Sequence, residues 1–117
     1  MRTFLLAVSL GALCVGAATA APTTKPYLAA AMADPARAAD REIDARRHPA
    51  ELIAFAGVRP GDRVVDLIPG SGYFTRIFAK VVGPKGHVYM IWPDEYAKEA
   101  QPDPEKNKDL AKAYGNV

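Results

Sequence analysis

A strand, a glycine turn and the start of a helix follow one another in VVDLIPGSGYFT, residues 64–75. Asp66 supplies a carboxylate before the turn, and Gly70 and Gly72 lack Cβ atoms, so a ligand can approach the main chain there. The helix beyond the turn presents unpaired N–H groups, which favour an anionic part of a ligand. The segment predicts a nucleotide-like ligand at this turn. The alternative is a glycine turn that only packs the strand against the helix.

Spacing argues against two common phosphate ligands. A P-loop would need a lysine and a serine or threonine at its end, and no lysine follows Gly72 directly. A dinucleotide-binding turn has the pattern G-x-G-x-x-G, and counting from Gly70 the third position falls on Thr75. The missing glycine and the acidic Asp66 together count against a pyrophosphate ligand.

The elements around the turn predict an α/β unit. Residues 64–68 and 87–92 are short apolar runs without clean alternation, which is typical of parallel strands buried on both faces. Between them we expect a helix with Arg76 and Lys80 on its exposed side. Its apolar positions recur with helical spacing: Phe74, Ile77, Phe78, Val81 and Val82. The order strand, helix, strand predicts a βαβ crossover.

Two helices are predicted ahead of this unit and two after it. Residues 34–47 begin with Asp34 as N-cap and contain few apolar side chains, so we expect a mostly solvated helix. Residues 49–57 predict a second helix with Leu52, Phe55 and Ala56 on one face, ended by a glycine. Residues 94–100 and 103–114 are weaker candidates for short helices.

The first residues are typical of a secretory signal peptide. A basic residue precedes the apolar run 4–16, and the small residues at 18–20 predict cleavage near Ala20 and Ala21. The run is shorter than the roughly 18 residues of a membrane span, so no stable span is expected after cleavage. We therefore expect an exported chain, periplasmic or secreted, with residues 1–20 as signal peptide and 21–33 as linker.

Composition gives few other functional signals. The formal net charge of +2 is close to balanced and does not favour a nucleic-acid partner. His48 and His87 are far apart and neither has a second ligand at metal-site spacing, so no metal site is predicted. The one cysteine, Cys14, lies in the predicted signal peptide.

The quoted stretch resembles the first motif of class I S-adenosylmethionine-dependent methyltransferases, which runs apolar, apolar, Asp or Glu, x, Gly, x, Gly, x, Gly. The upstream ADREIDARRHPAELIAFAGVRPGDRV and the downstream VVGPKGHVYMIW are similar to a bacterial branch of predicted methyltransferases that often carry signal sequences. The resemblance implies a Rossmann-like fold, with residues 34–117 as the N-terminal part of the domain. It also implies S-adenosylmethionine as cofactor and a methyl acceptor that the residues do not identify.

The motif assigns roles by position. Asp66 would help to position the methionine part of the cofactor, the residues from Pro69 to Gly72 would surround its amino-acid end, and Tyr73 would line the pocket or pack. The first glycine position is occupied by Ile68. At the end of the second strand, where the family has an acid for the ribose, stands Trp92. The implied cofactor-binding set is Asp66, Ile68, Pro69, Gly70, Ser71, Gly72, Tyr73, Trp92 and Asp94.

Two strands are fewer than a complete domain of this class needs, so the chain is expected to hold the cofactor loop without the later strands that carry catalysis. No catalytic residue is assigned, and a homo-oligomer is possible. Export would also separate the chain from the cytoplasm, where S-adenosylmethionine is made. Two alternatives stay open: an exported module that binds another small ligand in the same crevice, and a non-catalytic remnant of the fold.

Overall fold

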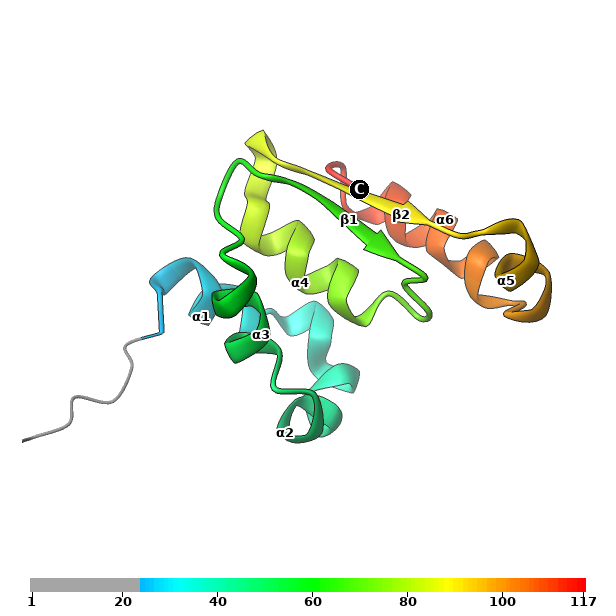
Figure 1. Cartoon of the computed structure of the whole chain (residues 1–117). Helices are drawn as coiled ribbons and strands as arrows, with labels where there is room; N and C mark the ends of the chain where they lie inside the picture. Colours follow the sequence, from blue (N-terminus) through cyan, green and yellow to red (C-terminus); the bar gives the residue numbers. More distant parts are fainter. Residues whose placement is uncertain (1–23) are drawn as a thin grey trace, which may run out of the picture.

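The computed structural model describes residues 24–117, so the predicted signal peptide lies outside the described residues. Figure 1 shows the helices on one side of a two-stranded sheet. Among residues 24–117 no helix has the length and apolar character of a membrane span. The elements in chain order are α1 (Pro26–Met32), the 3₁₀ helix η1 (Pro35–Ile43), α2 (Asp44–Arg47), α3 (Pro49–Ala56), β1 (Arg63–Leu67), α4 (Tyr73–Val82), the 3₁₀ turn η2 (Gly83–Lys85), β2 (His87–Ile91), α5 (Asp94–Glu99) and α6 (Asp103–Ala113).

The predicted strand–helix–strand unit is confirmed. β1 and β2 pair in parallel, from Arg63 opposite His87 to Leu67 opposite Ile91, and α4 connects them. Both short helices after β2 are also present. Together these elements form a partial Rossmann-like α/β fold, and the glycine turn lies at the carboxyl end of β1.

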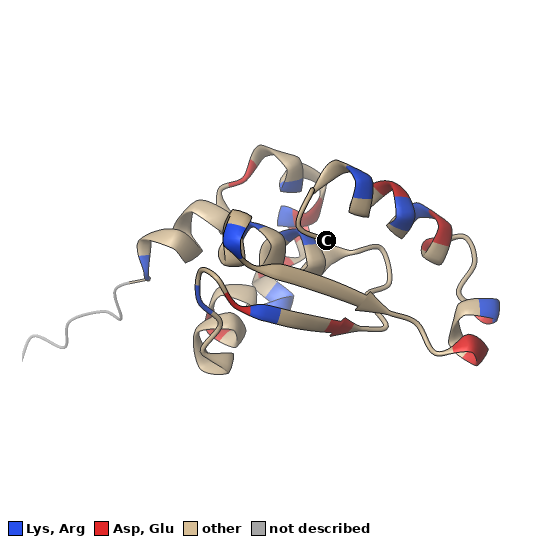
Figure 2. Ribbon diagram, turned by 90° about the horizontal axis from the view of Figure 1, so that it is seen from above, with Lys and Arg blue, Asp and Glu red and all other residues tan. Residues whose placement is uncertain are grey.

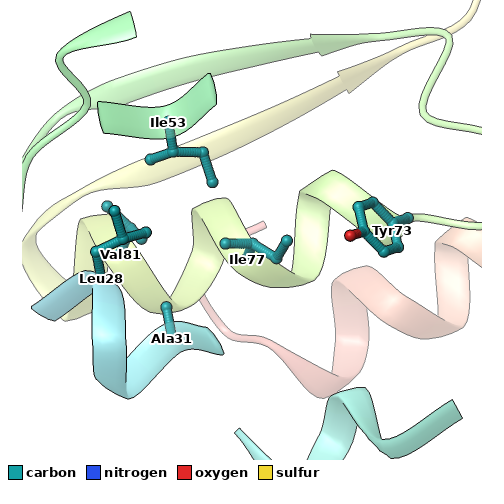
Figure 3. Close-up of a cluster of buried hydrophobic side chains, with 6 residues drawn as sticks. All are labelled: Leu28, Ala31, Ile53, Tyr73, Ile77 and Val81. Atoms are coloured by element: carbon teal, nitrogen blue, oxygen red, sulfur yellow. The ribbon is translucent and has the colours of Figure 1, made fainter. Parts of the chain in front are cut away.

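Helix α4 is the centre of packing. On one side, α1 and α3 bring apolar side chains against it (Figure 3). This first cluster consists of Leu28, Ala31, Ile53, Tyr73, Ile77 and Val81. On the other side, Ala79 and Val82 of α4 pack with Val88 of β2, which fixes α4 against the sheet. A helix packed on two sides holds its N-terminus, and with it the glycine turn, at a defined place.

The prediction of a linker over residues 21–33 is wrong for its second half. Residues 26–32 form α1, with Leu28 and Ala31 almost fully buried. Pro26 occupies the first turn, where its missing N–H costs nothing, and the alanines that follow favour a helix. Two well-placed apolar residues are enough to dock so short a helix on α4.

The predicted helix 49–57 is confirmed, but its predicted apolar face is not. Ile53 is the buried residue, whereas Leu52 is half exposed and Phe55 is 92% exposed. Helix α3 packs against α1 and α4 through Ile53, which lies next to Leu52 in the sequence and outside the predicted face. The segment 34–47 is mostly exposed, as expected, and within it only Arg37 is buried. It forms η1 and α2 instead of the single helix that was predicted.

The sheet is covered on one face only within the described residues, contrary to the prediction of strands buried on both faces. Val65, Leu67, Tyr89 and Ile91 are each between 42% and 62% exposed. The register places Val65 beside Tyr89 and Leu67 beside Ile91, so the four side chains form one apolar surface. Figure 2 shows the two strands with few charged residues, while both signs of charge alternate on α6.

Candidate functional site

In the loop between β1 and α4, every second residue has a positive φ angle. Ile68, Gly70 and Gly72 all have positive φ angles, of 57°, 56° and 80°. These are the three positions that the methyltransferase motif reserves for glycine. Because residues with a Cβ atom rarely adopt left-handed φ angles, the conformation itself explains the spacing of the glycines.

Ile68 departs from the motif and is strained. A β-branched side chain in the left-handed region is sterically unfavourable. The residue keeps the motif geometry because its N–H donates to the carbonyl of Ile91 at 2.9 Å, which ties the start of the loop to the end of β2. The first turn of the loop is therefore imposed by the sheet rather than favoured by its own side chain.

The two glycines differ in what surrounds them. A Cβ atom on Gly70 would meet nothing within 4 Å, whereas one on Gly72 would lie 2.4 Å from the Leu110 side chain of α6. The absence of a side chain at Gly72 thus lets Leu110 of α6 pack closely against the loop. Gly70 faces open space, where a ligand can reach the main chain. Pro69 is buried and Ser71 is exposed.

Asp66 lies in β1 and is partly buried. Its Oδ2 accepts a hydrogen bond of 2.5 Å from the hydroxyl of Thr75, which is buried in α4. Burial raises the pKa of Asp66, and the hydrogen bonds from Thr75 only partly offset this rise. The carboxyl also lines a groove of about 380 Å³ between α3, β1 and α4, together with apolar side chains such as Phe74. A carboxyl group whose pKa is raised by burial at the wall of a groove is a candidate for a functional role.

Tyr73 is a core residue, so its burial fits the packing role, one of the two roles left open for it. Its side chain is 2% exposed, and its hydroxyl donates to Asp44 at 2.5 Å. Burial and this hydrogen bond raise the pKa of Tyr73 to about 12. The guanidinium groups of Arg37 and Arg47 lie 5.4 and 4.7 Å from the ring centroid. The tyrosine therefore fastens the residues before β1 to the start of α4.

The segment after β2 contains Trp92 and Asp94, the last two residues of the implied cofactor-binding set. Trp92 is partly buried, and its Nε1 is inaccessible and has no hydrogen-bond partner among the described residues. Asp94 is exposed in the first turn of α5. The backbone contact between Ile68 and Ile91 brings this segment beside the glycine loop. Within residues 24–117, neither side chain forms a hydrogen bond or an ion pair that would fix its orientation.

Two residues that hold the loop were missed by sequence reasoning. Asn107 of α6 is 3% exposed and donates to the carbonyl of Gly70 at 3.0 Å. Arg76, expected on the exposed side of its helix, is 16% exposed and donates to the carbonyl of Ser71 at 2.9 Å. An asparagine within a predicted helix was the one available signal, because asparagine disfavours helix interiors unless its side chain has a specific partner.

A parallel strand–helix–strand unit with this glycine loop defines a Rossmann-like class of protein, and the comparisons identify the family within it. The family model described as protein-L-isoaspartate(D-aspartate) O-methyltransferase matches residues 18–110. The chain belongs to this methyltransferase family, which confirms the resemblance to class I S-adenosylmethionine-dependent methyltransferases.

Curated relatives that match parts of the chain are named for different activities. A protein-L-isoaspartate O-methyltransferase of Ignicoccus hospitalis is 42% identical over 53 residues, which is 45% of this chain and 25% of that protein. A ubiquinone/menaquinone biosynthesis C-methyltransferase of Ectopseudomonas mendocina is 53% identical over 38 residues, 32% of this chain and 15% of that protein. The corresponding enzyme of Burkholderia vietnamiensis is 54% identical over 37 residues, again 32% and 15%. The chain spans a quarter or less of the length of these relatives. No solved structure is significantly similar to it.

Proposed function

We propose that the chain binds S-adenosylmethionine at the loop between β1 and α4. The observation that carries the proposal is the left-handed backbone at all three motif positions, Ile68, Gly70 and Gly72. The chain reproduces the loop geometry even where it lacks the motif glycine. The family match supports a methyl-donor cofactor rather than another nucleotide.

The polarity of the loop suits the amino-acid end of the cofactor. The main chain around Gly70 is open, and α4 begins immediately after Gly72, so N–H groups near its N-terminus favour a carboxylate. Asp66 lies before the loop. When its carboxyl group is ionised, it would attract the ammonium group of the methionine part. Ser71, exposed at the tip, adds a hydroxyl to the same surroundings.

The whole protein would then transfer a methyl group. The sulfonium sulfur keeps the bonding electrons as the methyl carbon bonds to an acceptor nucleophile, and S-adenosylhomocysteine remains. The relatives are named for O-methylation and for C-methylation, so their names do not select one acceptor for this chain. No residue of the loop is proposed as an acid or base, because in such a transfer the positioning of two reactants supplies much of the rate.

Calorimetric titration of the full chain with S-adenosylhomocysteine tests cofactor binding. A saturable heat is expected from the folded wild-type protein. The Gly70→Ala variant should bind much more weakly, because the added methyl group occupies the open space at the loop, while its fold is retained. A folded wild-type chain that gives no heat would reject the proposal.

A second candidate is an exported module that binds another small ligand in this crevice. The observation that favours it is Trp92 at the position where the resemblance implies an acid for the ribose hydroxyls. Adenosine in the same titration separates the two candidates. Binding of adenosine without any gain from the homocysteine part would favour the second candidate, since it would show that the loop does not recognise the amino-acid end.

We further propose that the chain is exported, on the basis of its N-terminal residues. N-terminal sequencing of protein from the periplasmic or culture fraction is expected to begin at Ala21. A full-length chain that begins at Met1 and stays in the cytoplasmic fraction would contradict export.

A further inference from the structure

The carbonyl groups of the four loop residues from Pro69 to Gly72 all accept hydrogen bonds from the protein. The carbonyl of Pro69 accepts from the N–H of Gly72 at 2.9 Å, and that of Gly72 accepts from the N–H of Arg76 at 3.1 Å. The carbonyls of the two intervening residues, Gly70 and Ser71, accept hydrogen bonds from side chains. Asn107 donates to Gly70 and the guanidinium of Arg76 donates to Ser71. The loop therefore has its acceptors bound within the fold, which leaves N–H donors for an anionic ligand group.

Arg76 connects this loop to the segment before β1. Its Nε and Nη2 donate to the two carboxylate oxygens of Asp40 at 2.6 and 2.8 Å, while its Nη1 donates to the carbonyl of Ser71. Both side chains are mostly buried, at 16% and 14% exposure. A planar guanidinium can bind a carboxylate with two N–H groups and still donate a third in a fixed direction. The Asp40 pair thus sets the orientation in which Arg76 reaches the loop.

We propose that Arg76 and Asn107 are positioning residues of the cofactor loop, and that Asp40 of η1 acts on the loop through Arg76. This inference rests on the proposed function, and it goes further because it makes the segment before β1 a determinant of cofactor affinity. The two side chains keep the carbonyls of Ser71 and Gly70 turned toward the protein. Without them, a carbonyl would be free to turn toward the ligand carboxylate and repel it.

Three variants of the full chain test this role. Arg76→Lys keeps the positive charge but cannot bind Asp40 with two N–H groups and Ser71 at once. It should weaken binding of S-adenosylhomocysteine about 10-fold, the usual cost of one charge-assisted hydrogen bond. Asp40→Asn should weaken it less, because Arg76 keeps its contact with Ser71. Asn107→Ala should reproduce the effect of Arg76→Lys through Gly70.

Lys80→Met is the matched control. Lys80 lies on the same helix and pairs with Asp34 of the same N-terminal region at 3.3 Å, and its side chain is half exposed. The variant removes an ion pair between α4 and the segment before β1, and this ion pair does not involve the loop. Affinity for S-adenosylhomocysteine should stay at the wild-type value in this variant.

A second measurement separates this inference from the proposed function. The carbonyl ¹³C shift of Ser71 and the exchange rate of the Gly72 N–H, measured without ligand, report on the loop itself. Arg76→Lys should move the shift and speed the exchange, and Lys80→Met should change neither. If these changes occur while the wild-type chain binds no S-adenosylhomocysteine, the positioning role stands and the proposed function fails. An unchanged loop in Arg76→Lys would overturn the inference. Where the wild type does bind S-adenosylhomocysteine, equal affinity of Arg76→Lys would overturn it as well.

Discussion

The loop after β1 and the segment after β2 leave the same edge of the sheet and differ in how they are held. In the first, Asn107 and Arg76 bind carbonyl groups, and Gly72 contacts α6. In the second, Trp92 keeps a buried Nε1 without a partner among the described residues, and Asp94 is exposed. The difference indicates that the methionine side of the proposed site is built before any ligand arrives, whereas the ribose side is not.

The largest effect is expected at Gly72, where loop and α6 meet. Gly72→Ala should lower the free energy of unfolding by about 2–4 kcal/mol, because backbone strain at positive φ adds to overpacking against Leu110. Gly70→Ala has the strain without the clash and should cost about 1 kcal/mol. Chemical denaturation of both variants measures the difference. Equal losses would show that α6 does not hold the loop.

Ile68 offers a gain in stability. Ile68→Gly removes the backbone strain of a β-branched residue with a left-handed φ angle, which should stabilise the fold by about 1–2 kcal/mol. About half of this gain is lost, because glycine has more conformational freedom in the unfolded chain. A net stabilisation of about 0.5–1 kcal/mol is expected in denaturation experiments. The variant should also bind S-adenosylhomocysteine at least as well as the wild type. A clear destabilisation would mean that the Ile68 side chain contributes packing that outweighs its strain.

Trp92 should respond weakly to loss of its indole N–H. Trp92→Phe removes a buried donor that has no partner among the described residues, so the unfolding free energy should stay within about 0.5 kcal/mol of the wild-type value. A tryptophan whose N–H is hydrogen-bonded would instead lose roughly 1–3 kcal/mol. A loss of that size would show that the segment after β2 is held as firmly as the loop after β1.

Asp66 gives the smallest effect, and it depends on pH. Burial raises the pKa of Asp66 above its ordinary value of 3.8. The folded state then binds the proton more tightly than the unfolded state, so stability decreases as pH rises from 3.8 through the folded-state pKa. Asp66→Asn should therefore have a slightly higher thermal midpoint than wild type at pH 7, with the difference vanishing below pH 3.8. A lower midpoint at pH 7 would show that the ionised carboxylate is stabilised by the fold.

Local signals in the sequence predicted much of the fold. Pro49 and Gly57 bound α3 at the predicted places, and short apolar runs marked both strands. The glycine loop was also predictable, because glycines at this spacing indicate where the backbone adopts left-handed φ angles. Such features depend on neighbours in the chain, which a sequence shows directly.

Contacts between distant segments could not be predicted in the same way. Arg76 meets Asp40 across 36 residues and Asn107 meets Gly70 across 37 residues, so neither partner is indicated by local spacing. The apolar positions of α4 span a wide arc, and α1 and η1 decide which side of the helix is buried. The burial of Tyr73 and of most of the Arg76 side chain depends on these neighbouring elements, so it could not be predicted from the pattern of α4 alone.

The most direct test of cofactor binding by the loop is a titration of the isotope-labelled chain with S-adenosylhomocysteine, followed by amide NMR. If the loop binds the cofactor, the amide signals of Gly70, Ser71 and Gly72 will show saturable shifts that are larger than the shift of the Trp92 indole signal. Adenosine alone should shift these loop amides little, because it lacks the amino-acid end. A folded chain whose loop amides do not respond to S-adenosylhomocysteine would contradict the account.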